Sequence, residues 1–134
     1  MTIRKGNPIA EIQKTQRRSK YGSKRTTVAG ITFSSKKEAL HYQELLVLQR
    51  SGLVKVIELQ PKFVILDSFK KNGKKWPARH YIADFRVTYA DGHQEIEDVK
   101  GRYMTEVFRL KWAFFEWRYP LLSLKIVTNV RGTT

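Results

Sequence analysis

The chain has 134 residues, and its 26 Lys and Arg outnumber its 12 Asp and Glu to give a formal net charge of +14. This length predicts one domain, and hydrophobic residues at 41% supply enough apolar material for a core. Because there is no cysteine, the composition excludes a disulfide scaffold, a Cys-ligated zinc site and a thiol nucleophile. We expect an intracellular, cytoplasmic protein without a membrane span or signal peptide, and a polyanionic partner such as nucleic acid.

Half of the excess charge lies in residues 1–25, which hold eight Lys and Arg and the single acid Glu11. This segment has few large apolar residues and no sustained periodicity, which is typical of a flexible arm. We therefore predict a basic N-terminal arm over 1–25 and a folded domain over 26–134. The arm is expected to contact phosphates, and the alternative is a tail that keeps the protein soluble.

The first predicted elements are a short extended piece at 30–33 and a helix at 35–51. Ser35 as N-cap, followed three residues later by Glu38, fits a capping box. The apolar residues that follow recur at helical spacing until Gly52.

Beyond this helix, β-branched and bulky residues predict strands over 53–66, interrupted at Pro61. A turn is predicted at Asn72-Gly73, within a basic loop. Further strands are predicted at 80–89 and 94–100, a second helix at 105–118 and a last strand at 122–130. The order predicts a single-domain α/β fold with a mixed β-sheet flanked by helices, α-β-β-β-α-β.

Two acids lie inside apolar strands, where an unpaired carboxylate is costly. They are Asp84 and Asp98, and Lys100 follows the second acid by two residues. Because strand side chains alternate, Asp98 and Lys100 share a face while Val99 points to the other, and Glu97 is expected to face solvent. A carboxylate beside an ammonium can hold a divalent cation and a water next to one phosphate.

The turn between these strands decides whether the two acids meet. A two-residue loop would place Asp84 opposite Val99, with the acids on opposite faces. A three-residue loop at 90–92, with Gly92 in the left-handed conformation, would place Asp84 directly across from Asp98 at a Cβ separation of about 4.5–5.5 Å. Such close carboxylates repel unless a Mg²⁺ ion binds between them. We predict this second register because glycine stands where it is required.

Each residue also has a simpler explanation. Either acid could pair with Arg86 or Arg102, and Lys100 could be a solvated strand end. A β-bulge could also turn Glu97 into the site in place of Asp98. The combination of converging acids, a nearby lysine and a basic background nevertheless favours a metal-dependent phosphodiesterase site.

The spacing of Asp84 and Asp98-Val99-Lys100 resembles the signature of the PD-(D/E)XK nuclease superfamily, although Ala83 stands where the motif has proline. The resemblance spans about residues 20–128 and implies a restriction-endonuclease-like core. Four stretches resemble small phage nucleases related to Holliday junction resolvases: SKKEA at 35–39, LQPKF at 59–63, YIADF at 81–85 and EDVKG at 97–101.

The resemblance implies roles for individual residues. Asp84 and Asp98 would ligate Mg²⁺ or Mn²⁺, with the Val99 carbonyl as a further ligand. Lys100 would orient or activate the attacking water and offset charge in the transition state. Glu38 would complete the site, although the capping box explains this residue equally well. Accessory candidates are Gln60, Glu97, Tyr103 and Lys111.

The resemblance therefore implies a metal-dependent DNA endonuclease acting on branched DNA, most simply a Holliday junction resolvase of DNA recombination. It would be a homodimer, since a four-way junction needs two cuts, and would act in a bacterial host if phage-encoded. The alternatives are a related nuclease acting on other DNA structures or ends, and a non-catalytic basic nucleic-acid-binding protein. Expected DNA contacts are Arg17, Arg18, Lys20, Lys24, Arg25, Lys36, Lys70, Lys71, Lys74, Lys75 and Arg102.

Overall fold

A computed structural model describes residues 24–101 and 103–128. Most of the predicted arm lies outside these residues, as do four of the expected DNA contacts, Arg17, Arg18, Lys20 and Arg102. The elements are β1 (Thr26–Val28), β2 (Ile31–Phe33), α2 (Lys36–Arg50), β3 (Val54–Leu59), β4 (Lys62–Leu66), β5 (Phe69–Lys71), β6 (Lys74–Trp76), β7 (Arg79–Ile82), β8 (Phe85–Tyr89), β9 (Gln94–Val99), α3 (Glu106–Arg118) and β10 (Leu124–Val127).

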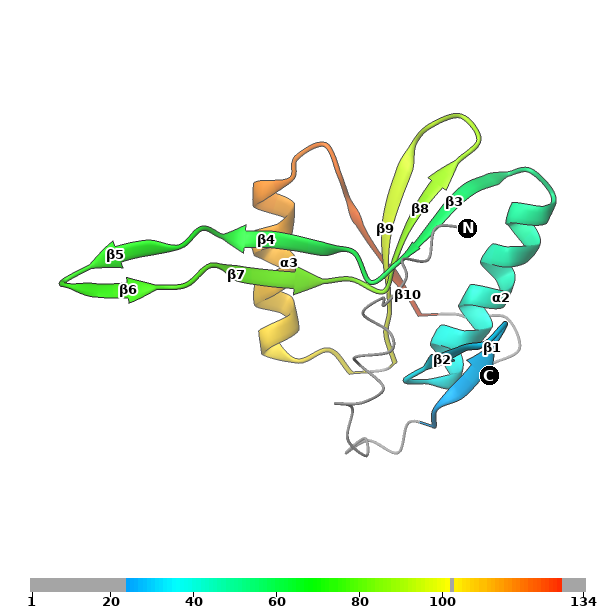
Figure 1. Ribbon diagram of the computed structural model, residues 1–134, viewed down its shortest axis with the longest axis horizontal. Helices are drawn as coiled ribbons and strands as arrows, with labels where there is room; N and C mark the ends of the chain where they lie inside the picture. The colour runs from blue at the N-terminus through cyan, green and yellow to red at the C-terminus, as the bar shows by residue number, and fades with distance from the viewer. Residues whose placement is uncertain (1–23, 102, 129–134) are drawn as a thin grey trace.

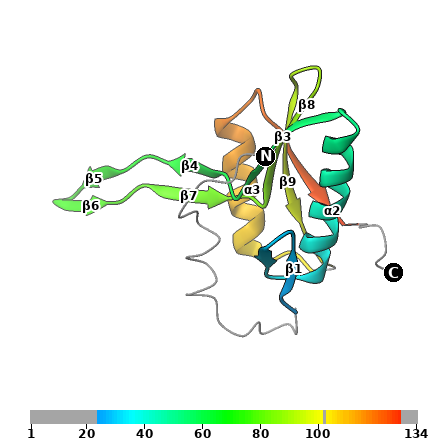
Figure 2. The same cartoon turned by 45° about the vertical axis from the view of Figure 1, so that its right-hand side comes forward.

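A four-stranded sheet with the order β10-β9-β8-β3 forms the centre of the domain. β9 and β10 run parallel, whereas β8 is antiparallel to both of its neighbours. The two helices cover opposite faces of this sheet (Figures 1 and 2). The fold is thus a single small mixed α/β domain, as the sequence predicts, and no helix within its described residues is long and apolar enough to cross a membrane.

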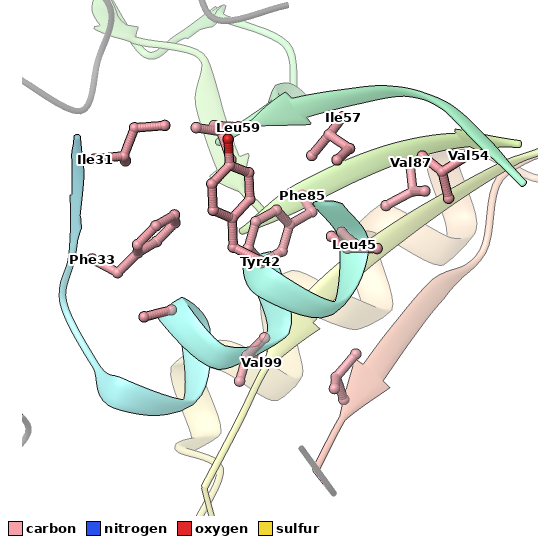
Figure 3. Packing of buried hydrophobic residues seen from close by; sticks show 12 residues of the cluster. Ile31, Phe33, Tyr42, Leu45, Val54, Ile57, Leu59, Phe85, Val87 and Val99 are labelled. Atoms are coloured by element: carbon pink, nitrogen blue, oxygen red, sulfur yellow. The ribbon is translucent and has the colours of Figure 1, made fainter. Parts of the chain in front are cut away.

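Alternation along the strands divides the core into two clusters. On the α2 face, Tyr42 and Leu45 pack against Phe85, Ile57 and other strand residues (Figure 3). On the α3 face, a second cluster gathers Phe108 and Phe115 of the helix with residues of β4, β7, β9 and β10. Both faces of β9 are therefore buried, which determines the surroundings of its acidic residues.

Helix α2 begins as the sequence predicts. The Ser35 hydroxyl accepts a hydrogen bond from the Glu38 backbone N–H at 3.1 Å, so it satisfies one of the free donors of the first turn. The same logic holds for α3, where Thr105 accepts from the Phe108 N–H at 3.0 Å. Each helix is therefore capped at its N-terminal end. In α2 this end carries Glu38, and in α3 it follows Lys100 along the chain.

Residues 62–82 form a two-stranded ribbon that projects away from the central sheet (Figure 1). β4 pairs with β7 at its base, and β5 pairs with β6 toward the tip. At the tip, Asn72 and Gly73 adopt φ values of +52° and +75°, which confirms the predicted turn.

The prediction of one strand over 80–89 is wrong, because the chain changes partner within it. β7 pairs with β4 in the ribbon, whereas β8 enters the central sheet. The break falls at Ala83 and Asp84, facing a second bend at Gln60 and Pro61. The Gln60 N–H donates to the Asp84 carbonyl at 2.9 Å, and the Ala83 N–H donates to the Pro61 carbonyl at 3.1 Å. These bonds hold Asp84 at the junction of sheet and ribbon.

The predicted register between β8 and β9 is confirmed. Phe85 lies opposite Glu97, and the Tyr89 N–H donates to the His93 carbonyl at 2.9 Å across the three-residue loop. Gly92 has a φ of +94°, a conformation that other residues adopt only with strain. The paired ladder ends at Phe85 and Glu97, and the Asp84 N–H, just before β8, donates to the same Glu97 carbonyl at 3.1 Å, which brings Asp84 next to Asp98.

Candidate active site

Three acidic side chains from separate elements lie close together. Asp98 comes from β9, Asp84 from the bend before β8, and Glu38 from the first turn of α2. The pKa of Asp84 is raised well above its ordinary value, first by burial and then by the negative charges of Glu38 and Asp98. The side chain of Asp84 is also within hydrogen-bonding reach of Asp98. The two aspartates meet as the hairpin geometry predicts.

Two hydrogen bonds to the backbone of β9 hold Asp84 in position. Its Oδ2 accepts a hydrogen bond from the Val99 N–H at 2.7 Å, and its own N–H donates to the Glu97 carbonyl at 3.1 Å. Because these contacts use backbone groups of β9, the position of Asp84 depends on how the chain pairs with that strand.

Asp98 is 4% exposed and has two polar neighbours on its own face. The Tyr81 hydroxyl donates to Oδ2, and the Lys100 ammonium lies 3.5 Å from Oδ1. Burial and the charge of Asp98 raise the pKa of Tyr81, which therefore remains a hydrogen-bond donor at neutral pH. The Lys100 Nζ also lies 3.9 Å from the centre of the Phe108 ring, so a cation–π contact and the ion pair with Asp98 together fix its position.

Glu38 serves as a capping residue without losing its carboxylate to that role. The helix cap uses its backbone N–H, whereas its Oε1 accepts hydrogen bonds from Ser34 at 2.6 Å and Ser35 at 3.5 Å. Burial raises the pKa of Glu38, and the charge of Asp98 raises it further while that of Lys100 lowers it. The Glu38 carboxylate therefore lies close enough to the two aspartates and to Lys100 for their charges to interact.

The expectation that Glu97 faces solvent is wrong. Glu97 is 1% exposed, and its Oε1 lies 2.6 Å from Nε2 of His41 on α2. It points to the opposite side of β9 from Asp98, because neighbouring strand residues alternate and helix α2 covers that side. The ladder is regular through Glu97, so no bulge exchanges it with Asp98. The alternative partner Arg86 lies 3.2 Å from Glu58.

A family model described as "Protein of unknown function (DUF1064)" matches residues 18–133, a span that includes every residue of this site. The chain belongs to the DUF1064 family. No curated protein matches the chain in sequence. The function of this DUF1064 member is therefore argued from the site itself.

Two further contributors adjoin the acids. Sequence reasoning missed Tyr81, although it stands three residues before Asp84 in a stretch quoted for the family resemblance. Gln60, predicted as an accessory, has a φ of +52° and a buried Oε1 without a hydrogen-bond partner in the described part of the chain. Its backbone contact to Asp84 places it at the edge of the site. The other accessories, Tyr103 and Lys111, are exposed just before and on α3.

The basic residues expected to bind DNA are exposed wherever the structure describes them. Lys70, Lys71, Lys74 and Lys75 lie on the tip of the ribbon, where Lys74 sits 4.0 Å over the Trp76 ring. The remaining members lie near the start of the described chain: Lys24, Arg25 and Lys36.

The residues fit a hard divalent cation by donor type and by charge. Among residues 24–101 and 103–128, no three His, Cys, Asp or Glu side chains stand ready-placed around a common metal position. Asp84, Asp98 and Glu38 nevertheless bring three carboxylates against one ammonium, and burial together with their mutual repulsion raises the pKa values of Asp84 and Glu38. A divalent cation would offset this surplus charge, and carboxylate and carbonyl oxygens are the donors that Mg²⁺ takes.

Proposed function

We propose that this protein is a metal-dependent DNA endonuclease of the PD-(D/E)XK type. The observation that carries the proposal is the meeting of Asp84 and Asp98 across an antiparallel pair, with Lys100 3.5 Å from Asp98 on the same face. Further support comes from the element order α2, β3, β8, β9, α3, β10, which follows α-β-β-β-α-β once the ribbon is treated as an insertion.

Asp84 and Asp98 would hold Mg²⁺ or Mn²⁺, with Glu38 and the Val99 carbonyl as further ligands. The bound ion supplies Lewis acidity at the phosphate and a water of lowered pKa. Since the pKa values of Asp84 and Glu38 are raised, these groups retain protons to higher pH than ordinary acids and must release them before they bind a cation. Cation affinity is therefore expected to rise with pH.

Lys100 would act on the phosphate and the attacking water. Its ammonium carries positive charge beside an otherwise acidic cluster, and its packing against Phe108 holds it in place before DNA arrives. It would stabilise charge on the phosphate as the water attacks and the product 5′-phosphate forms. Tyr81 would keep Asp98 oriented by donating to the oxygen that does not face Lys100.

The ribbon is the proposed duplex contact. A two-stranded β-ribbon fits the major groove of DNA, and this one carries four exposed lysines at its tip. Its base joins the bend that carries Asp84, so DNA bound along it would lead toward the acids. Replacing Lys70, Lys71, Lys74 and Lys75 by alanine should weaken DNA binding and reduce the slope of log affinity against log salt by up to about 3–4. Lys55→Ala, on β3, is the matched control.

For substrate we propose branched DNA, cut by a homodimer as a resolvase would cut it. The test compares a four-way junction, a flap and a linear duplex with Mg²⁺, using the wild type and Asp98→Asn. The proposal expects paired cuts in the junction by the wild type, and retained binding without cleavage by the variant. Equal cutting of all three substrates would leave a nuclease without junction preference, whereas no metal-dependent cleavage would favour the non-catalytic nucleic-acid-binding protein.

A further inference from the structure

Helix α3 carries two apolar stripes, and the sheet covers only one of them. The covered stripe contains Phe108 and Phe115, with Trp112 and Tyr119 packed against the same cluster. The other stripe is exposed and consists of Val107, Leu110, Phe114 and Trp117, continued beyond the helix by Leu121. At 100° per residue these stripes lie on nearly opposite sides of the helix.

The exposed stripe has the spacing of a helix–helix seam. Within the helix its members follow one another at intervals of three, four and three residues, which is the a/d pattern of a heptad repeat, and Leu121 lies just beyond the helix end. Trp117 is 77% and Leu110 is 60% exposed, so large apolar surfaces face away from the domain. Contiguous apolar surface of this kind marks an interaction site.

The charges that flank the stripe fit a second copy of the same helix in parallel orientation. With Val107 at position a, Glu106 takes position g and Lys111 takes the following position e. In a parallel pair these two positions face each other across the seam, which gives a Glu106–Lys111 contact on each side of the two-fold axis. Neither residue forms an ion pair with another described part of the chain. An antiparallel pair centred on Phe114 would instead bring Lys111 toward Arg118, which already pairs with Asp67 at 2.8 Å, and would lose the Glu106–Lys111 contacts.

We infer that the protein forms a homodimer through the exposed stripe of α3, with the two helices parallel. The domain bodies then lie on the outer sides of the helix pair, because each sheet packs on the opposite face of its own α3. The N-terminal ends of both helices lie at the same end of the dimer.

This orientation has a consequence that rests on the proposed nuclease function. Lys100 packs on Phe108 in the first turn of α3, so each candidate active site lies at the N-terminal end of its helix. Both sites would therefore open at the same end of the dimer. Two sites on one side can cut two strands of one branched DNA molecule.

The experiment measures the solution mass of the full chain by sedimentation equilibrium, without DNA or metal. The wild type is expected at twice 15.7 kDa, and Leu110→Glu is expected to lose half of that mass. Val47→Glu, an equal change at an exposed apolar residue of α2, should remain dimeric. A monomeric wild type, or a Leu110→Glu variant that stays dimeric, would overturn the inference.

Charge exchange tests the orientation separately. Glu106→Lys and Lys111→Glu should each weaken the dimer, and the double variant should restore it. A double variant as weak as the worse single one would overturn the parallel arrangement. Because the readout is mass, these outcomes do not depend on nuclease activity, and a monomeric variant that still nicks DNA would leave the proposed chemistry intact.

Discussion

Strand β9 buries two consecutive acids in different ways. Glu97 points toward α2 and meets one basic partner, His41, at 2.6 Å. Asp98 points toward α3 and meets Lys100, the Tyr81 hydroxyl and the further acids Asp84 and Glu38. Glu97 and the neighbouring acid Glu95 face His41 and Lys125, whereas Asp98 belongs to a cluster of three acids that faces the ammonium of Lys100. Burial alone therefore does not distinguish the two acids; their charged neighbours do.

The largest expected difference between these acids is in cleavage. Asp98→Asn should lower the rate of DNA cleavage at least about a thousandfold, because the site loses a metal ligand and the charge opposite Lys100. Glu97→Gln is the matched control, since it makes the same chemical change one residue away on the other face. Single-turnover cleavage of labelled DNA measures both variants. Similar losses in the two would contradict the assignment of different roles.

A smaller effect is expected for stability, and here Glu97→Gln should be the more damaging of the two substitutions. Glu97→Gln should lower the free energy of unfolding by about 1–3 kcal/mol, because it weakens a buried hydrogen bond between charged or chargeable groups. Asp98→Asn should lower it less, since repulsion within the cluster is relieved at the same time. Urea unfolding followed by circular dichroism measures the difference. A larger destabilisation by Asp98→Asn would mean that its cluster is a structural network.

The smallest expected effect is a pH dependence that belongs to the acidic cluster. The pKa values of Asp84 and Glu38 in the folded state lie above their ordinary values. At a pH between the ordinary and the raised pKa values, the folded state therefore binds more protons than the unfolded state. The free energy of unfolding of the metal-free protein should therefore fall as pH rises from about 4 through the raised values. Asp84→Asn should flatten this fall and be more stable than the wild type at neutral pH. Denaturation midpoints that rise with pH over this range would refute it.

Local chemistry predicted much of the fold and part of the site. Ser35 predicted the start of α2, and Gly92 predicted the loop that sets the register of β8 against β9. These features depend on a few adjacent residues, so their signal is present in the sequence.

The features that sequence reasoning missed depend on distant contacts. Alternation along β9 predicts that Glu97 and Asp98 point to opposite faces, but it does not show that both faces are covered, so the sequence alone indicates a solvent-facing Glu97. Its partner His41 lies 56 residues away. The break at Asp84 was missed because both halves of 80–89 have strand composition, and only pairing with 62–66 on one side and the central sheet on the other divides them.

Binding of Mn²⁺ by isothermal titration calorimetry tests the central claim most directly, because it requires neither DNA nor turnover. The wild type and Glu97→Gln should bind the ion with similar affinity, and Asp98→Asn should lose that binding. Equal binding by the wild type and Asp98→Asn, or no binding by any of the three proteins, would contradict the account.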